Sequence, residues 1–231
     1  MVLGVLLFLL TGVSFASTSS DALAAFNRKD YATAFQLWER CAKSGDAGCQ
    51  YDVGIMYIEG EGRPVDVKSG IEWFSKSAGQ GNVKAQNRLG RLYLNGKVVT
   101  QDYARAMEYF MAAARQGYAA GQANIGLMYW RGYGVPVDLV EAFAWSELST
   151  QNLASGARQR DDILKELSPD QWTKARDRAK ALGKQYVVSK IPWTQIFEGV
   201  SGVVSILTAV LILWSFARSK KKRVRTATHE M

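Results

Sequence analysis

Apolar and small residues recur at helical spacing through most of the chain, and the pattern itself recurs every 36 residues. In residues 83–94, Ala85, Leu89 and Leu92 share one helical stripe. A glycine-containing turn follows, and residues 102–115 predict a partner helix. Each copy of the pattern is therefore predicted to be a helix–turn–helix unit, and stacked units are predicted to make an all-α fold.

Several residue types keep this register without a gap. Aspartates are expected to begin the second helix of each unit, small residues to allow turns and close backbone approach, and aromatic residues to fill the remaining gaps. The series are Asp30, Asp66, Asp102 and Asp138; Gly54, Gly90 and Gly126; Tyr57, Tyr93 and Tyr129; Gly60, Gly96 and Gly132; and Trp73, Tyr109 and Trp145. Three full copies are predicted to fill 47–154, after an N-terminal half-repeat at 17–46.

Beyond the third copy the period fades, as is typical of a terminal unit that shows a polar outer face to solvent. Residues 155–190 are therefore predicted to form a helical C-terminal cap. Within it, Ser168 and Gln171 have the spacing of a capping box around Pro169. This spacing predicts a helix that runs to about Lys184.

Both ends of the sequence are predicted to lie outside the repeat array. Residues 1–16 are apolar and end in small residues, which is typical of a signal peptide cleaved between Ala16 and Ser17. A linker is predicted at 191–198. Residues 199–217 carry no charge over a length that can cross a bilayer as one helix, so they predict a transmembrane helix.

The residues after this predicted span indicate its orientation. Six of the 29 basic residues lie in the tail at 218–231, and positive juxtamembrane segments stay in the cytoplasm. The repeats are therefore expected to be exported, into a bacterial periplasm by preference and into the endoplasmic-reticulum lumen as the second choice. The span and the tail are expected to contact membrane lipids. Ser201, Ser205 and Ala209 share one helical face whose small residues would allow a homodimer or another helix contact.

The repeated units resemble the Sel-one-like repeat, a relative of the tetratricopeptide repeat. The resemblance is carried by CQYDVGIMYIEGEGRPVD at 49–66, AQNRLGRLYLNG at 85–96 and ANIGLMYWRGYGVPVD at 123–138. Val53 and Ile125 replace the leucine of the family's LG-x-x-Y-x-x-G core, and the loop of the second copy departs from the pattern. The resemblance implies an α-solenoid of tetratricopeptide-like repeats, here with one C-terminal transmembrane helix.

The two cysteines flank a predicted turn between helices, at a spacing that allows their Cα atoms to approach within bridging distance. A redox-active or metal-binding pair is the alternative, although active dithiols usually lie closer in sequence and a metal needs more ligands. The spacing of Cys41 and Cys49 is similar to that of the cysteine-rich secreted branch of the family. That resemblance implies a structural disulfide between them.

Composition narrows the classes of function. With 48% hydrophobic and 22% charged residues, the chain is neither disordered nor polytopic, and its charges alternate, so nucleic acid is not an expected partner. The one histidine, His229, lies in the predicted tail. No catalytic, metal or cofactor site is predicted, and we expect no enzyme. A cell-wall-directed or β-lactam hydrolase of the cysteine-rich repeat type remains the alternative that the resemblance implies.

The predicted function is a membrane-tethered, exported adaptor or regulator that binds another protein with the concave face of its repeat array. The resemblance places such proteins in envelope assembly, secretion or signalling. Arginine and aromatic residues outside the shared pattern are the candidate contacts, because these types are enriched at interface hot spots. They are Arg88, Arg91, Trp130, Arg131 and Tyr133.

Overall fold

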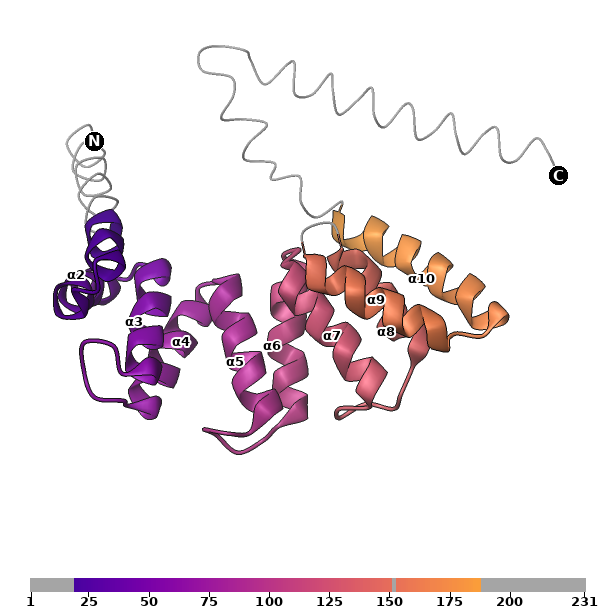
Figure 1. Cartoon of the computed structure of the whole chain (residues 1–231), viewed down its shortest axis with the longest axis horizontal. Coiled ribbons are helices and arrows are strands. Elements are labelled where there is room, and N and C mark those ends of the chain that lie inside the picture. Colours follow the sequence, from indigo (N-terminus) through magenta and orange to yellow (C-terminus); the bar gives the residue numbers. More distant parts are fainter. Residues whose placement is uncertain (1–18, 151–152, 188–231) are drawn as a thin grey trace, which may run out of the picture. The chain divides into compact units, whose positions relative to one another are not determined.

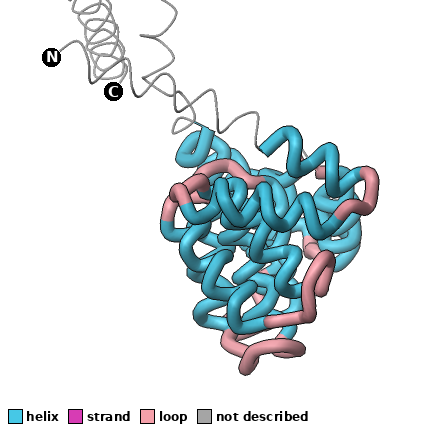
Figure 2. The backbone as a smooth tube through the Cα atoms, turned by 90° about the vertical axis from the view of Figure 1, so that its left-hand side faces the viewer, coloured by secondary structure: helices cyan, strands magenta, loops and turns pink. Residues whose placement is uncertain are grey.

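The computed structural model describes residues 19–150 and 153–187, all of which belong to the first of two compact units of the chain, Met1–Lys190 and Ile191–Met231. These described residues form helices and connecting loops (Figure 2). Residues 19–27 are helical. The helices that follow are α2 (Tyr31–Lys43), α3 (Ala47–Glu59), α4 (Val67–Gly79), α5 (Val83–Asn95), α6 (Tyr103–Arg115), α7 (Ala119–Arg131), α8 (Leu139–Ser149), α9 (Ala154–Glu166) and α10 (Pro169–Val187). The predicted all-α repeat fold is confirmed.

Local sequence explains where the repeat helices begin and end. The four aspartates of the 36-residue series cap α2, α4, α6 and α8, and each side chain accepts a hydrogen bond from the backbone N–H three residues later. The first helix of each full repeat ends at a glycine in the left-handed conformation, which has no Cβ to clash: Gly60, Gly96 and Gly132. The predicted helix–turn–helix unit is present in all three repeats.

From α2 to α9, helices that follow one another in sequence pack against one another (Figure 1). Within the first two repeats, a glycine of the first helix lies against an aromatic ring of the second helix. A Cβ at Gly54 would lie 2.6 Å from the ring of Phe74, and a Cβ at Gly90 would lie 2.6 Å from that of Phe110. Phe74 and Phe110 are fully buried. They sit one residue after the aromatic series in which we expected the gap-filling rings.

The N-terminal unit has more structure than the sequence period indicated. Residues 19–27 add a first helix to the predicted half-repeat, and Ala22 and Ala25 of this helix join Trp38 of α2 in one buried cluster. Cys41 and Cys49 form a disulfide, with Cα atoms 5.7 Å apart, between α2 and α3. The expected bridge is therefore present in this unit.

The C-terminal cap begins at α9 and ends with α10. Ser168 and Gln171 form the predicted capping box, since each backbone N–H donates to the other's side chain. The helix α10 packs against α8, which also holds α9. Leu182 and Tyr186 of α10 share a buried cluster with Trp145, whose ring centroid lies 5.3 Å from that of Tyr186.

Several predicted segments lie outside the described residues: the signal peptide at 1–16 with its cleavage site at Ala16 and Ser17, the linker at 191–198, the span at 199–217 with Ser201, Ser205 and Ala209, and the tail at 218–231. In the part of the chain that the structure describes, no helix has both the length and the apolar character needed to span a bilayer. The membrane predictions remain predictions.

Candidate functional site

A ladder of buried glutamines holds the first helix of each repeat in place. Gln50, Gln86 and Gln122 recur at 36 residues, and the side-chain amide of each donates to a carbonyl at the end of the preceding helix, at Ala42, Ala78 and Ala114. Gln50 and Gln86 also accept from Gln80 and Gln116, which follow the second helices of their own repeats. Because buried amides need such partners, the ladder sets the spacing of α3, α5 and α7.

These three helices present a continuous stripe of side chains, which we call the A-helix face. It is defined by Asp52, Ile55 and Glu59 of α3, Lys84, Arg88 and Arg91 of α5, and Asn124, Leu127 and Arg131 of α7. All nine are half-buried or exposed, and within each helix they are spaced three or four residues apart. Side chains join the first helices of successive repeats. Arg88 of α5 pairs with Glu59 of α3 at 3.0 Å, and Asn124 of α7 donates to Asn87 of α5 at 2.8 Å.

The charge of the A-helix face changes from acidic at α3 to basic at α5 and α7. Burial raises the pKa of Asp52 to about 6, although the charge of Lys84 opposes this shift. The negative charge of Glu59 is neutralised by its salt bridge with Arg88. Among the described residues, Arg91 and Arg131 make no ion pair. The guanidinium charges of these two exposed arginines are therefore available to pair with carboxylates of a partner.

The structure separates the five predicted contact residues into two kinds. Trp130 packs in the cluster that holds Ile163, and its Nε1 donates to Glu166 of α9 at 3.0 Å. Tyr133 stacks on Tyr103 of the preceding repeat, with ring centroids 5.6 Å apart. Both side chains, like Arg88, are already engaged within the array.

Arg91 and Arg131 are the exposed members of the predicted set. Arg131 stacks over the Trp130 ring, with 3.8 Å between the guanidinium carbon and the ring centroid. Whether any of the five binds a partner remains a prediction. Asp52 and Lys84 were not predicted. For Asp52 a signal was available, because Asp52, Arg88 and Asn124 occupy one repeat position at which the residue type changes between repeats.

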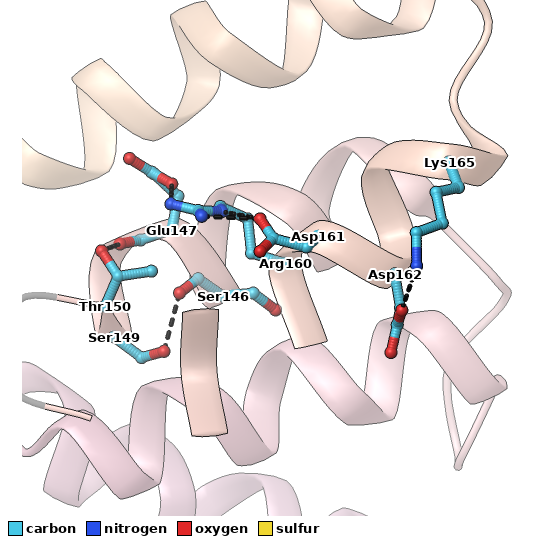
Figure 3. A network of polar contacts seen from close by, with 8 residues as sticks. All are labelled: Ser146, Glu147, Ser149, Thr150, Arg160, Asp161, Asp162 and Lys165. Carbon is cyan, nitrogen blue, oxygen red and sulfur yellow. Dashed lines mark hydrogen bonds and ion pairs between the residues drawn. The ribbon is translucent and has the colours of Figure 1, made fainter. Parts of the chain in front are cut away.

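A pocket lies at the cap, between α8, α9 and α10. It has a volume of about 530 Å³, with Phe143, Leu164 and Trp172 among its walls. Figure 3 shows polar contacts beside this pocket: Arg160, which lines it, bonds Glu147 and Asp161, and the Ser149 hydroxyl donates to the backbone carbonyl of Ser146. The Arg160–Glu147 pair joins α9 to α8, so it stabilises the cap.

The described residues include one group of side chains close enough together to hold a metal ion, which is Cys41, Asp46 and Cys49. The two sulfur atoms are bonded to each other, and Asp46 caps α3 by accepting from the Cys49 N–H at 2.7 Å. A disulfide sulfur is not a thiolate and does not act as a metal ligand or nucleophile. This cluster therefore serves the fold.

Comparisons with solved structures agree with the repeat architecture. One similar structure is a protective antigen present in uropathogenic Escherichia coli strains that displays an SLR fold, with 30% identity and a TM-score of 0.62. The alignment covers 75% of this chain and 37% of the antigen, so the chain spans well under half of that protein's length. Another is a Sel1 repeat protein from Oxalobacter formigenes, with 26% identity, a TM-score of 0.63 and coverage of 76% and 73% respectively.

No curated protein matches the chain. The Sel1 repeat matches residues 28–46, 47–82, 83–118 and 119–152, which together make up more than half of the sequence. The chain belongs to the Sel1 repeat family.

Proposed function

We propose that the protein is an adaptor that binds another protein with its A-helix face. The observation that carries the proposal is the arrangement of this face: three helices held in register by the glutamine ladder, with Arg91 and Arg131 exposed and without an ion pair among the described residues. A rigid surface of this kind loses little conformational entropy on binding. Exposed arginines favour a partner that presents carboxylates.

The adaptor is proposed to be exported and tethered to a membrane, with a role in envelope assembly, secretion or signalling. The support is the sequence at the two ends: an apolar leader-like segment at 1–16, the uncharged segment at 199–217 and the basic tail at 218–231. A periplasmic location is our first proposal and the lumen of the endoplasmic reticulum the second. Protease protection of the repeats in intact bacterial spheroplasts would contradict the periplasmic location.

The binding function is tested by site-specific photo-crosslinking in the source cell. A photoreactive residue at Leu127, four residues before Arg131 on the A-helix face, is expected to give a discrete adduct with one protein. The matched control is the same residue at Glu72, which is exposed on α4 away from this face. Adducts of equal yield at both positions, or none at Leu127, would contradict the proposal.

A further inference from the structure

The pocket at the cap, which we call the cap pocket, is an apolar groove on the surface of the last unit. The main helix contacts of α9 and of α10 are both with α8, so α9 and α10 form the two sides of the groove. Leu164 and Trp172 on its walls are 39% and 37% exposed, and the Trp172 ring lies edge-on against Phe143. Two large apolar side chains exposed in one polar-rimmed groove favour an interface with another surface.

The side of the cap pocket formed by α8 and α9 carries an excess of negative charge. Glu147 and Asp161 line this side, and both pair with the guanidinium of Arg160, at 3.0 and 2.6 Å (Figure 3). Glu147 is half-buried and Asp161 is exposed. Two carboxylates and one guanidinium give this side, which we call the acidic edge, a net charge of −1.

The side of the cap pocket formed by α10 carries the opposite excess. Arg176 and Lys180 line it one helical turn apart, and both are exposed. Within the described part of the chain, their ion pairs are with Asp177, at 3.9 and 3.7 Å, and not with the acidic edge. Two cations and one carboxylate give this side, the basic edge, a net charge of +1.

A groove with an acidic edge and a basic edge is complementary to itself, because a twofold rotation brings the acidic edge of one copy against the basic edge of the other. We propose that the cap pocket binds a second copy of this chain in a symmetric dimer. The helix α10 of each copy lies along the groove of the other, where Trp172 packs against Leu164 of the second copy and Lys180 pairs with Asp161 of the second copy. This interface goes beyond the adaptor function and uses none of the residues that define the A-helix face.

The twofold symmetry provides a test that separates a second copy from other occupants of the groove. Lys180→Glu changes the charge of the basic edge from +1 to −1, so both edges of that variant are acidic. Asp161→Lys changes the acidic edge from −1 to +1, so both edges of that variant are basic. Each variant repels a copy of itself, whereas one copy of each variant attract one another. A groove that holds a lipid or a different protein predicts no such rescue.

The test uses the whole 231-residue chain in a mild detergent, with its molar mass measured by light scattering after size exclusion over a range of concentrations. We expect a dimer for the unaltered chain and about tenfold weaker association for each of the two variants alone. An equimolar mixture, with one variant labelled with ¹⁵N, is expected to show the mixed dimer in native mass spectrometry. The association in this mixture is expected to return to within about threefold of that of the unaltered chain.

The matched control is Lys174→Glu, which reverses an exposed cation of α10 that does not line the pocket and is expected to leave the dimer unchanged. Circular dichroism verifies that each variant keeps its helices. A chain that stays monomeric up to about 0.1 mM would overturn the proposal. So would a dimer that persists unchanged in both variants, as one held by the predicted span at 199–217 would, or the absence of a mixed dimer.

Discussion

The backbone of Gly90 in α5 lies directly against the ring of Phe110 in α6, because a Cβ at residue 90 would lie 2.6 Å from Phe110 Cε1. The same relationship joins Gly54 and Phe74 in the preceding repeat. The ring of Phe110 is fully buried and touches the backbone of α5, so it cannot shift aside without disturbing its other neighbours. This contact therefore sets the distance between the two helices of a repeat.

Gly90→Ala is expected to lower the free energy of unfolding by about 1–3 kcal/mol, because the added methyl overpacks the contact with Phe110. Gly183→Ala is the matched control, since that glycine lies inside α10 and a Cβ added there would meet no atom within 4 Å. In the control, the free energy of unfolding is expected to rise by about 0.5–1 kcal/mol, because alanine has a higher helix propensity than glycine. Urea unfolding followed by circular dichroism measures both, and equal effects of the two substitutions would contradict the packing account.

Removal of one glutamine of the ladder is expected to loosen two contacts at once. Gln86→Leu deletes the hydrogen bond to Ala78 O and the one from Gln116, while Ala78 O keeps its bond from the Gly81 N–H. The expected cost is about 1–3 kcal/mol of stability. Gln116→Ala, at an exposed position, is expected to cost less. A stability of Gln86→Leu equal to that of the unaltered chain would show that the ladder does not hold the helices.

The disulfide between Cys41 and Cys49 closes a short loop at the N-terminal unit. Its removal in the Cys41→Ser/Cys49→Ser double variant is expected to cost about 2–3 kcal/mol, through the entropy that the unlinked unfolded chain recovers. The unaltered chain is expected to lose the same stability in strong reductant, whereas the double variant is insensitive to it. Mass mapping under non-reducing conditions that found two free thiols would contradict the bridge.

The stability of the protein is expected to fall as the pH rises from about 4 to about 6. Burial raises the pKa of Asp52 to about 6 in the folded chain, from 3.8 for the free group. In this window the folded state binds more protons than the unfolded state, so a rise in pH favours unfolding. The free energy of unfolding is expected to fall by about 2 kcal/mol, a value reduced for the partial exposure of the Asp52 carboxylate. The neighbouring charges, Lys84 and Asp46, act in opposite directions and weaken each other's effect.

Asp52→Asn removes this titration and tests its assignment. The variant is expected to be more stable than the unaltered chain at pH 7.5 and equally stable at pH 4, in urea unfolding at both pH values. A difference in stability that is the same at the two pH values would mean that Asp52 acts through contacts rather than through its charge.

Trp130 and Arg131 are adjacent in sequence and are expected to act differently. Trp130→Ala is expected to cost about 2–4 kcal/mol, because the ring packs between α7 and the cap. Arg131→Ala, at an exposed position, is expected to change stability by no more than about 0.5 kcal/mol and to lower the Leu127 crosslink yield. A crosslink yield that Arg131→Ala does not alter would remove this arginine from the proposed interface.

Much of the repeat fold could be predicted because its signals are local. The aspartate caps and the turn glycines act within a few residues, so their 36-residue spacing alone located the helices. The site was harder to predict. Trp130 stood out from the shared pattern by residue type, yet it occupies the same register as Ile58 and Leu94, which pack between helices. The packing role of Trp130 could be predicted from its position in the repeat, but not from its residue type.

The sequence by itself determined the repeat length, the helix boundaries and the pairing of helices within each unit, since these depend on caps, turns and apolar stripes close together in the chain. Only the tertiary structure decided that α10 packs against α8, that the helix at 19–27 completes the first unit, and that Trp38 and Asp52 line one pocket. Each of these arrangements depends on which side chains from separate helices pack into the same buried surface. A local sequence pattern does not contain that information.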